Sequence, residues 1–122
     1  MLLCHSIPNK TKEIKQHEKS EQIWHNKYVE RAFNGACQEY DTPYSTIVDA
    51  YPLRSCQAEV IETTHYYILR SYRTKIACIN KDSKVCFDAL RLVYGYTSTS
   101  AHHISKFKQD YGATSTVTWR YI

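Results

Sequence analysis

The chain has 122 residues, of which 43% are hydrophobic and 23% charged, and its net charge is +4. This length fits one domain with a real core, and the composition excludes an intrinsically disordered chain. No stretch approaches the roughly 18 apolar residues of a membrane-spanning helix, and Met1 to Cys4 is too short for a signal peptide, so we expect a cytoplasmic protein without a membrane partner.

The positive charge belongs to the second half of the chain. Residues 62–122 contain 9 Lys/Arg against 4 Asp/Glu, a net of +5, whereas residues 1–61 contain 7 against 8, a net of −1. A field of this kind is typical of proteins with an acidic partner, either nucleic acid or an acidic protein face. An equal imbalance is also common in domains that have no such partner.

Five cysteines are spread along the chain without any C-x-x-C pair. This pattern is neither a disulfide framework nor a zinc site, and we expect Cys78 and Cys86, which lie in apolar runs, to be core residues. The sequence contains no G-x-S-x-G, P-loop or H-E-x-x-H motif. We therefore expect neither a metal nor a cofactor, and no enzyme.

The first element in chain order is an amphipathic helix. Apolar residues between Ile23 and Ala36 recur at three- and four-residue steps, which predicts a helix docked through Trp24, Tyr28 and Phe33. We expect it to begin at about residue 11 or 20 and to end at Asn34-Gly35, although the apolar pattern could continue to Cys37. The alternative for its first turns is a solvated arm. Residues 1–37 are thus a helical segment and residues 38–122 an α+β domain, together forming one compact unit.

The second segment connects this helix to a β-rich region. Residues 38–55 read as a connector with a turn at 41–44, and residues 45–48 as either a short strand or the start of a helix. Period-2 patterns then predict strands over 58–62, 65–72, 74–79, 85–87 and 115–121, with a polar hairpin turn over 80–84 and a further apolar segment over 90–94.

A short helix over about residues 99–111 interrupts these strands. Its Ala101, Ile104, Phe107, Lys108 and Tyr111 lie close to one face, which we expect to pack on the sheet, while His102, His103 and Lys106 lie nearer solvent. The predicted fold is α+β: an N-terminal helix, a mainly antiparallel sheet of about 4–6 strands, this short helix packed on the sheet, and a final β-strand.

Three motifs are candidates for chemistry. The hydroxyl-rich turn 97–100 precedes the short helix, where backbone N–H groups and the helix dipole favour an anion; Ser98, Ser100, Arg91 and Lys106 could form such a site. The alternative is a helix cap in a polar turn.

His102 and His103 are the second motif. Adjacent residues point about 100° apart on a helix, so this pair does not chelate a metal from one face. A surface contact or a pH-sensitive pairing fits the pair better.

The third motif interleaves aromatic and basic residues from Arg70 to Lys75. Tyr66 and Tyr72 would share a sheet face with Arg70, an arrangement that single-strand-binding proteins use to stack bases and neutralise phosphates. Tyrosine on a sheet face also often covers a core, and this alternative stays open.

Residues 71–77 and 90–107, with the Asp110-Tyr111-Gly112 ending, resemble a small family from phages, plasmids and other mobile elements of Firmicutes. Its members pair an S-Y-x-T-x-I-A strand with a Y-G-Y-T-x-T-S-A-x-H-I-x-K-F helix, and the resemblance covers about half the chain, residues 58–113. The family has no assigned chemistry. Its context implies a small protein that blocks or modifies a host system, and anti-CRISPR proteins are a prominent group of that kind.

We therefore expect a phage or mobile-element protein, in the cytoplasm of a host bacterium, that inhibits a host nucleoprotein. The expected target is a type II (Cas9) CRISPR effector protein or its guide RNA, blocked at guide RNA or target DNA engagement. The alternative is an accessory RNA- or DNA-binding module of element replication or transfer, and a third possibility is a small hydrolase that uses a cysteine or the histidine pair. The expected contact residues are Arg70, Arg73, Lys75, Arg91, Tyr96, Ser98, Ser100, His102, His103, Lys106 and Lys108.

Overall fold

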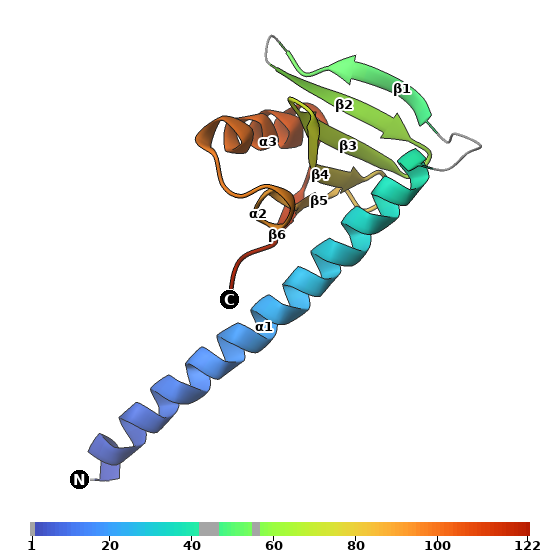
Figure 1. The fold of residues 1–122 in the computed structure, drawn as a ribbon. Helices are drawn as coiled ribbons and strands as arrows, with labels where there is room; N and C mark the ends of the chain where they lie inside the picture. Colours follow the sequence, from blue (N-terminus) through green and yellow to red (C-terminus); the bar gives the residue numbers. More distant parts are fainter. Residues whose placement is uncertain (1, 42–46, 55–56) are drawn as a thin grey trace.

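The computed structural model describes the backbone of residues 2–41, 47–54 and 57–122, and the side chains of residues 19–41, 49–54 and 57–122. It confirms the predicted α+β class, with an N-terminal helix, a six-stranded, mostly antiparallel sheet and a short helix (Figure 1). The elements run in the order α1 (Leu2–Asp41), β1 (Ile47–Pro52), β2 (Ala58–Thr63), β3 (Tyr66–Ser71), β4 (Thr74–Asn80), β5 (Val85–Asp88), α2 (Leu90–Val93), α3 (Ser98–Asp110) and β6 (Ser115–Thr118).

The six strands lie in the sheet in chain order. Strands β1 to β5 form an antiparallel meander, because the connections between them are too short for a crossover. The predicted hairpin turn over 80–84 is confirmed, since it joins the antiparallel strands β4 and β5. Strand β6 instead pairs parallel to β5, because α2 and α3 lie between them and carry the chain back to the same end of the sheet.

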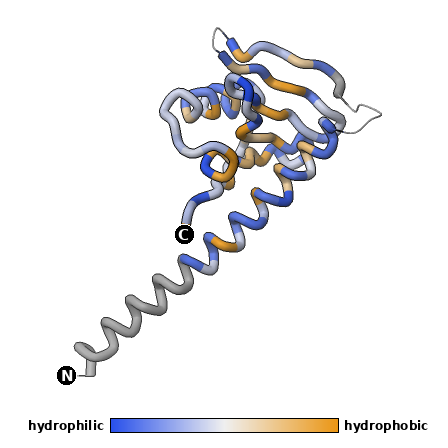
Figure 2. Tube along the Cα trace, in the orientation of Figure 1, coloured by the Kyte–Doolittle hydropathy of each residue, from blue (hydrophilic) through white to orange (hydrophobic). Residues whose placement is uncertain are grey.

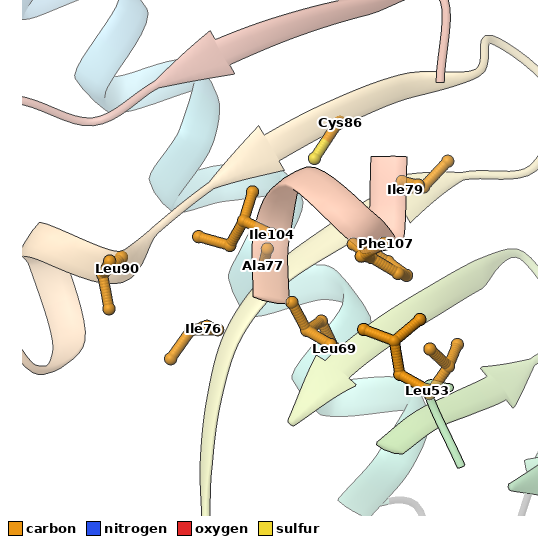
Figure 3. Close-up of a cluster of buried hydrophobic side chains, with 10 residues drawn as sticks. Leu53, Leu69, Ile76, Ala77, Ile79, Cys86, Leu90, Ile104 and Phe107 are labelled. Atoms are coloured by element: carbon orange, nitrogen blue, oxygen red, sulfur yellow. The ribbon is translucent and has the colours of Figure 1, made fainter. Parts of the chain in front are cut away.

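Both faces of the sheet are buried, so the molecule has three layers. Successive residues of a strand point to opposite faces. Val60 and Leu69 accordingly pack with α3, whereas their neighbours Ile61 and Ile68 pack with α1. Figure 3 shows Ile104 and Phe107 of α3 above the sheet, and the apolar residues in Figure 2 gather on the strands and on the helix turns beside them. The cluster under α3 consists of Leu53, Val60, Leu69, Ile76, Ala77, Ile79, Cys86, Leu90, Ile104 and Phe107, and that under α1 of Val29, Ala32, Phe33, Ala36, Ile61, Ile68, Cys78, Phe87 and Ala89.

A β-bulge in β4 adjusts this alternation. The register between β3 and β4 shifts where Leu69 pairs with Ala77 but Arg70 pairs with Lys75, so that Ile76 is the extra residue. Ile76 and Ala77 consequently both belong to the cluster under α3, although they are neighbours in the strand. The bulge gives the α3 side of the sheet one more large apolar side chain than strict alternation would.

Helix α1 is longer than predicted at both ends. It begins at Leu2, and it continues through Gly35 to Asp41 instead of stopping at Asn34-Gly35. A glycine within a helix costs about 1 kcal/mol relative to alanine. The burial of Phe33 and Ala36 against the sheet outweighs this cost.

The end of the last strand and the connector also differ from the prediction. Strand β6 ends at Thr118, not at Tyr121, because the backbone of Arg120 pairs with a side chain of α1: its N–H donates to Asn26 Oδ1 and its carbonyl accepts from Asn26 Nδ2.

The apolar segment 90–94 forms the short helix α2. Residues 47–48 begin β1, so a helix start at 45–48 is wrong, and the turn predicted at 41–44 lies largely outside the described residues.

The predicted core cysteines are confirmed. Cys78 and Cys86 are both fully buried, and burial raises the pKa of each thiol, that of Cys86 to about 12. None of the helices in the described part of the chain is both long and apolar enough to cross a membrane.

Phe107 should be a main contributor to the stability of the α3 layer, since its side chain is fully buried among the strands. We expect Phe107→Ala to lower the free energy of unfolding by about 3–5 kcal/mol, because it removes buried apolar surface and leaves a cavity. Urea denaturation followed by circular dichroism measures this. The exposed Ser105→Ala on the same helix serves as control and should change stability by less than about 0.5 kcal/mol. Equal stability of the two variants would contradict the layer arrangement.

Candidate functional site

The hydroxyl-rich turn before α3 provides a helix cap. Thr97 has an extended backbone, and its Oγ1 accepts a hydrogen bond from the Ser100 N–H at 3.2 Å. This satisfies one of the N–H groups that a helix start leaves without an intrahelical partner. One hydroxyl of the four therefore acts as the cap, which leaves Ser98, Thr99 and Ser100 for other contacts.

Ser100 joins a buried polar cluster that connects α3 to the end of β3. Ser71 Oγ lies 3.1 Å from Ser100 Oγ and 2.8 Å from His103 Nδ1. All three residues are buried, with exposed fractions of 3%, 6% and 4% for Ser71, Ser100 and His103. A neutral imidazole accepts at Nδ1 from the Ser71 hydroxyl, whose oxygen can in turn accept from Ser100. We refer to these three residues as the Ser–His cluster.

The position of His103 corrects the predicted orientation of α3. The helix buries Ser100, His103, Ile104 and Phe107, a face rotated from the predicted one, so that His103 points inward while His102 stays exposed. The physical reason is the hydroxyl of Ser71, which offers the imidazole a hydrogen-bond partner at the end of the interior strand β3. A buried polar side chain needs such a partner, and the sequence of α3 alone does not contain it.

Burial lowers the pKa of His103 below its ordinary value of 6.5, and the positive charges of Lys106 and His102 act in the same direction. The imidazole is therefore neutral at pH 7, in agreement with a role as hydrogen-bond acceptor inside the Ser–His cluster.

A cavity of about 250 Å³ lies beside the Ser–His cluster. Its lining is rich in hydroxyls: Ser71, Tyr72, Thr74, Ile76, Tyr94, Thr97, Thr99 and Ser100. The lining includes neither Arg91 nor Lys106, the two cations predicted to complete an anion site there. Arg91 instead stacks on Tyr96, at 4.7 Å from the guanidinium carbon to the ring centroid. The predicted convergence of hydroxyls and cations is thus not formed.

The predicted aromatic and basic sheet face is not formed either. Tyr72 lies in the turn after β3 with a φ of 55°, so it does not continue the alternation of the strand. Arg70 forms an ion pair with Glu59, its cross-strand neighbour on β2. Arg70 and Tyr72 still line one pocket, but the Glu59 carboxylate in the same lining neutralises the Arg70 charge there.

Lys75, the third predicted cation of this stretch, is held by the end of α1. Its Nζ lies 3.5 Å from the centroid of the Tyr40 ring and 3.9 Å from an Asp41 carboxylate oxygen. Glu59 and Asp41 both come from the acidic first half of the chain, so part of the positive charge in the second half is neutralised inside the molecule.

A different surface gathers exposed tyrosines and arginines. Tyr94, Tyr96 and Tyr121 have exposed fractions of 66%, 58% and 70%. The C-terminal residues reach α2, since Tyr121 Oη donates to the carbonyl of Arg91 at 2.8 Å. This brings residue 121 beside the Arg91–Tyr96 pair. We call the set Arg91, Tyr96, Arg120 and Tyr121 the Tyr–Arg surface, whereas Tyr94 lines the cavity beside the Ser–His cluster.

Three cations influence Asp88 next to this surface. Burial raises the pKa of the Asp88 carboxyl, although Arg91, Lys108 and Arg120 each act to lower it. In the part of the chain that the structure describes, no carboxylate lies within ion-pair distance of these three cations. Arg91 and Arg120 thus bring positive charge to the Tyr–Arg surface, whereas Lys108 lies with Ser115 and Thr116 at the start of β6.

The remaining predicted residues are dispersed. Arg73 is exposed in the turn between β3 and β4, Ser98 and His102 are exposed on α3, and Lys106 is half-buried. Of the predicted set, Ser100 and His103 join the Ser–His cluster, Arg91 stacks on Tyr96, and Arg70 pairs with Lys75 across β3 and β4. The sequence reasoning missed Ser71, Tyr94 and Tyr121 as site residues. For Tyr121 the alternation with Val117 and Trp119 pointed to a strand, and no local signal marked Ser71.

Comparison with known proteins adds no family to this picture, because no family model, no curated protein and no solved structure matches the chain. Among the described residues, no group of three His, Cys, Asp or Glu side chains is placed to hold a metal ion.

The Ser–His cluster should make stability depend on pH. Because the pKa of His103 is lowered in the folded state, the unfolded chain binds this proton more readily, and the contribution is complete above pH 6.5 and lost as the pH falls below it. We expect the wild type to lose more stability between about pH 8 and about pH 5 than His103→Gln does. Urea denaturation across this range tests the difference. His102→Gln, on the exposed side of α3, should stay close to wild type, and an unchanged pH dependence in His103→Gln would refute the assignment.

Proposed function

We propose that this chain is a binding protein of a phage or mobile element that acts in the host cytoplasm by engaging a host nucleoprotein through its Tyr–Arg surface. The observation that carries this proposal is the presence of two exposed tyrosines at Arg91, which stacks on Tyr96 and whose carbonyl accepts a hydrogen bond from Tyr121. Tyrosine and arginine are enriched among the residues that dominate binding energies at interfaces, and exposed apolar patches often mark such sites.

The same surface suits a partner that contains nucleic acid. Arg91 and Arg120 provide positive charge, and the tyrosine rings provide faces on which bases or side chains can stack. A nucleoprotein offers both phosphates and protein side chains. The resemblance of residues 58–113 to a mobile-element family supports a host defence complex as the target, and a type II CRISPR effector (Cas9) with its guide RNA is the partner to test first.

An inhibitor and an accessory nucleic-acid-binding module require different partners. An inhibitor holds the assembled effector and blocks guide RNA or target DNA engagement, whereas an accessory module of element replication or transfer binds RNA or DNA without any effector. The exposed Val93 and Ile122, with exposed fractions of 41% and 66%, extend the Tyr–Arg surface with apolar area. Apolar area of this kind favours a protein component in the partner, and thus the inhibitor.

The direct test is a pull-down and a DNA-cleavage assay with several type II effectors, each loaded with guide RNA. We expect the protein to be retained with at least one effector and to slow its cleavage. Absence of both retention and inhibition across all effectors would rule out this function.

Tyr96→Ala and Arg91→Glu should each weaken binding of this protein to an effector that it inhibits by about tenfold or more. The first removes a stacked ring from the Tyr–Arg surface, and the second removes the cation that stacks on it. Isothermal titration calorimetry or biolayer interferometry measures the change. Tyr51→Ala, which removes an exposed tyrosine on β1, is the matched control and should bind as the wild type does. Equal losses for Tyr51 and Tyr96 would place the contact elsewhere.

A further inference from the structure

Helix α1 exposes a tryptophan where a solvent-facing helix ordinarily carries polar side chains. Trp24 has an exposed fraction of 63%, and Tyr28, one turn later, has 39%. The opposite side of the same turns is buried: Asn26, Val29 and Phe33 face the sheet and the C-terminal residues. Trp24 therefore does not belong to the core of this domain, and a large exposed aromatic side chain is an informative observation.

Trp24 and Tyr28 share their helix face with two cations. Residues 24, 27, 28 and 31 are spaced at i, i+3, i+4 and i+7, so Trp24, Lys27, Tyr28 and Arg31 line one shallow groove of about 410 Å³. We call it the α1 groove. None of these four described lining residues is a carboxylate. Glu21, one turn before Trp24, is the acidic residue at the N-terminal end of this face. Glu30 lies on another side, where its carboxylate accepts a hydrogen bond from Trp119 Nε1 at 2.9 Å.

The geometry of the two rings defines how a planar ligand group can bind. The ring centroids of Trp24 and Tyr28 are 5.5 Å apart at 58°, so the rings already touch and leave no slot between them. Tyr28 in turn packs edge-on against Phe87 of β5 at 4.9 Å, which anchors it to the sheet. The His25 ring also contacts Trp24 edge-on, at 5.6 Å between centroids. A planar group therefore stacks on the part of the exposed Trp24 ring that Tyr28 and His25 leave open, with Tyr28 as a fixed support.

We propose that the α1 groove binds a single-stranded polynucleotide, with a base stacked on Trp24 and backbone phosphates on Lys27 and Arg31. Aromatic rings alternating with cations are the general chemistry of single-strand binding, and they discriminate against duplexes, whose bases are already stacked. Charge complementarity selects this occupant over an apolar protein helix, because a groove with two cations and no carboxylate among its described lining residues matches phosphates. This inference rests on the proposed function, and it adds α1 to the Tyr–Arg surface as a second contact for the nucleic-acid component of the partner.

The test uses the full chain and fluorescence anisotropy with labelled oligo(U), oligo(dT) and duplex DNA, each about 12 nucleotides or base pairs long. We expect the single strands to bind more tightly than the duplex. Trp24→Ala should weaken single-strand binding on the order of tenfold, and Trp24→Phe should keep most of the affinity because it keeps a ring. A preference for oligo(U) or oligo(dT) identifies the strand as RNA or DNA.

The cations are tested through the salt dependence. Lys27→Glu combined with Arg31→Glu should lower the slope of log affinity against log salt by about 1.4, since each phosphate contact on a single strand contributes about 0.7. The control is Arg73→Glu combined with Lys84→Glu, which makes the same change of charge at exposed turns outside the groove and should keep the wild-type slope. Circular dichroism should show unchanged unfolding for all these variants, whose substituted side chains are exposed.

Several outcomes would overturn the inference. These are no single-strand binding at low salt, equal affinity for duplex, or full affinity in both Trp24→Ala and the double charge variant. Loss of effector retention in Trp24→Ala with unchanged oligonucleotide binding would mean that a protein occupies the groove. The two proposals can be refuted separately. Effector inhibition without oligonucleotide binding would refute only polynucleotide binding by the α1 groove. Oligonucleotide binding without any effector inhibition would refute only the proposed function.

Discussion

Burial of the sheet on both faces is the constraint on which the rest of the structure depends. The central strands β3 and β4 place apolar residues on both sides, and each side needs its own cover. Helix α3 covers one side through Ile104 and Phe107, and the second half of α1 covers the other through Val29 and Phe33. This requirement keeps α1 helical through Gly35, and it fixes α3 close enough to β3 for Ser71 to reach His103.

Electrostatics within the fold determines which charges remain for a partner. Glu59 and Asp41 neutralise Arg70 and Lys75 at the sheet, and Arg54 pairs with Asp110 at the end of α3. The stretch from Arg70 to Lys75, where basic residues are densest in the sequence, is therefore not where the second half of the chain exposes most of its net positive charge. That charge is displayed around Arg91, Lys108 and Arg120, which come from α2, α3 and the residues after β6.

Local sequence patterns predicted those features of the fold that depend on residues close together in the chain. The hydrophobic periods of 3.6 and 2 gave the α+β class, the positions of most strands and the burial of Cys78 and Cys86. They could not give the inward orientation of His103, because its partner Ser71 is 32 residues away. They also could not give the end of β6, where Asn26 of α1 competes with the sheet for the backbone of Arg120. These two errors each concern a long-range polar contact, which no periodicity encodes.

The double hydrogen bond between Asn26 and Arg120 also has a consequence for how the protein is made. It joins residues 94 positions apart, and Gln22 and Trp119 add further contacts between the same two segments. Contacts of such sequence separation form late and slow folding. During synthesis, therefore, α1 leaves the ribosome long before the segment that fixes it. Until β6 and residues 119–120 have emerged, the apolar face of α1 and one side of the growing sheet stay incompletely covered, and in this interval the nascent chain is most exposed to aggregation.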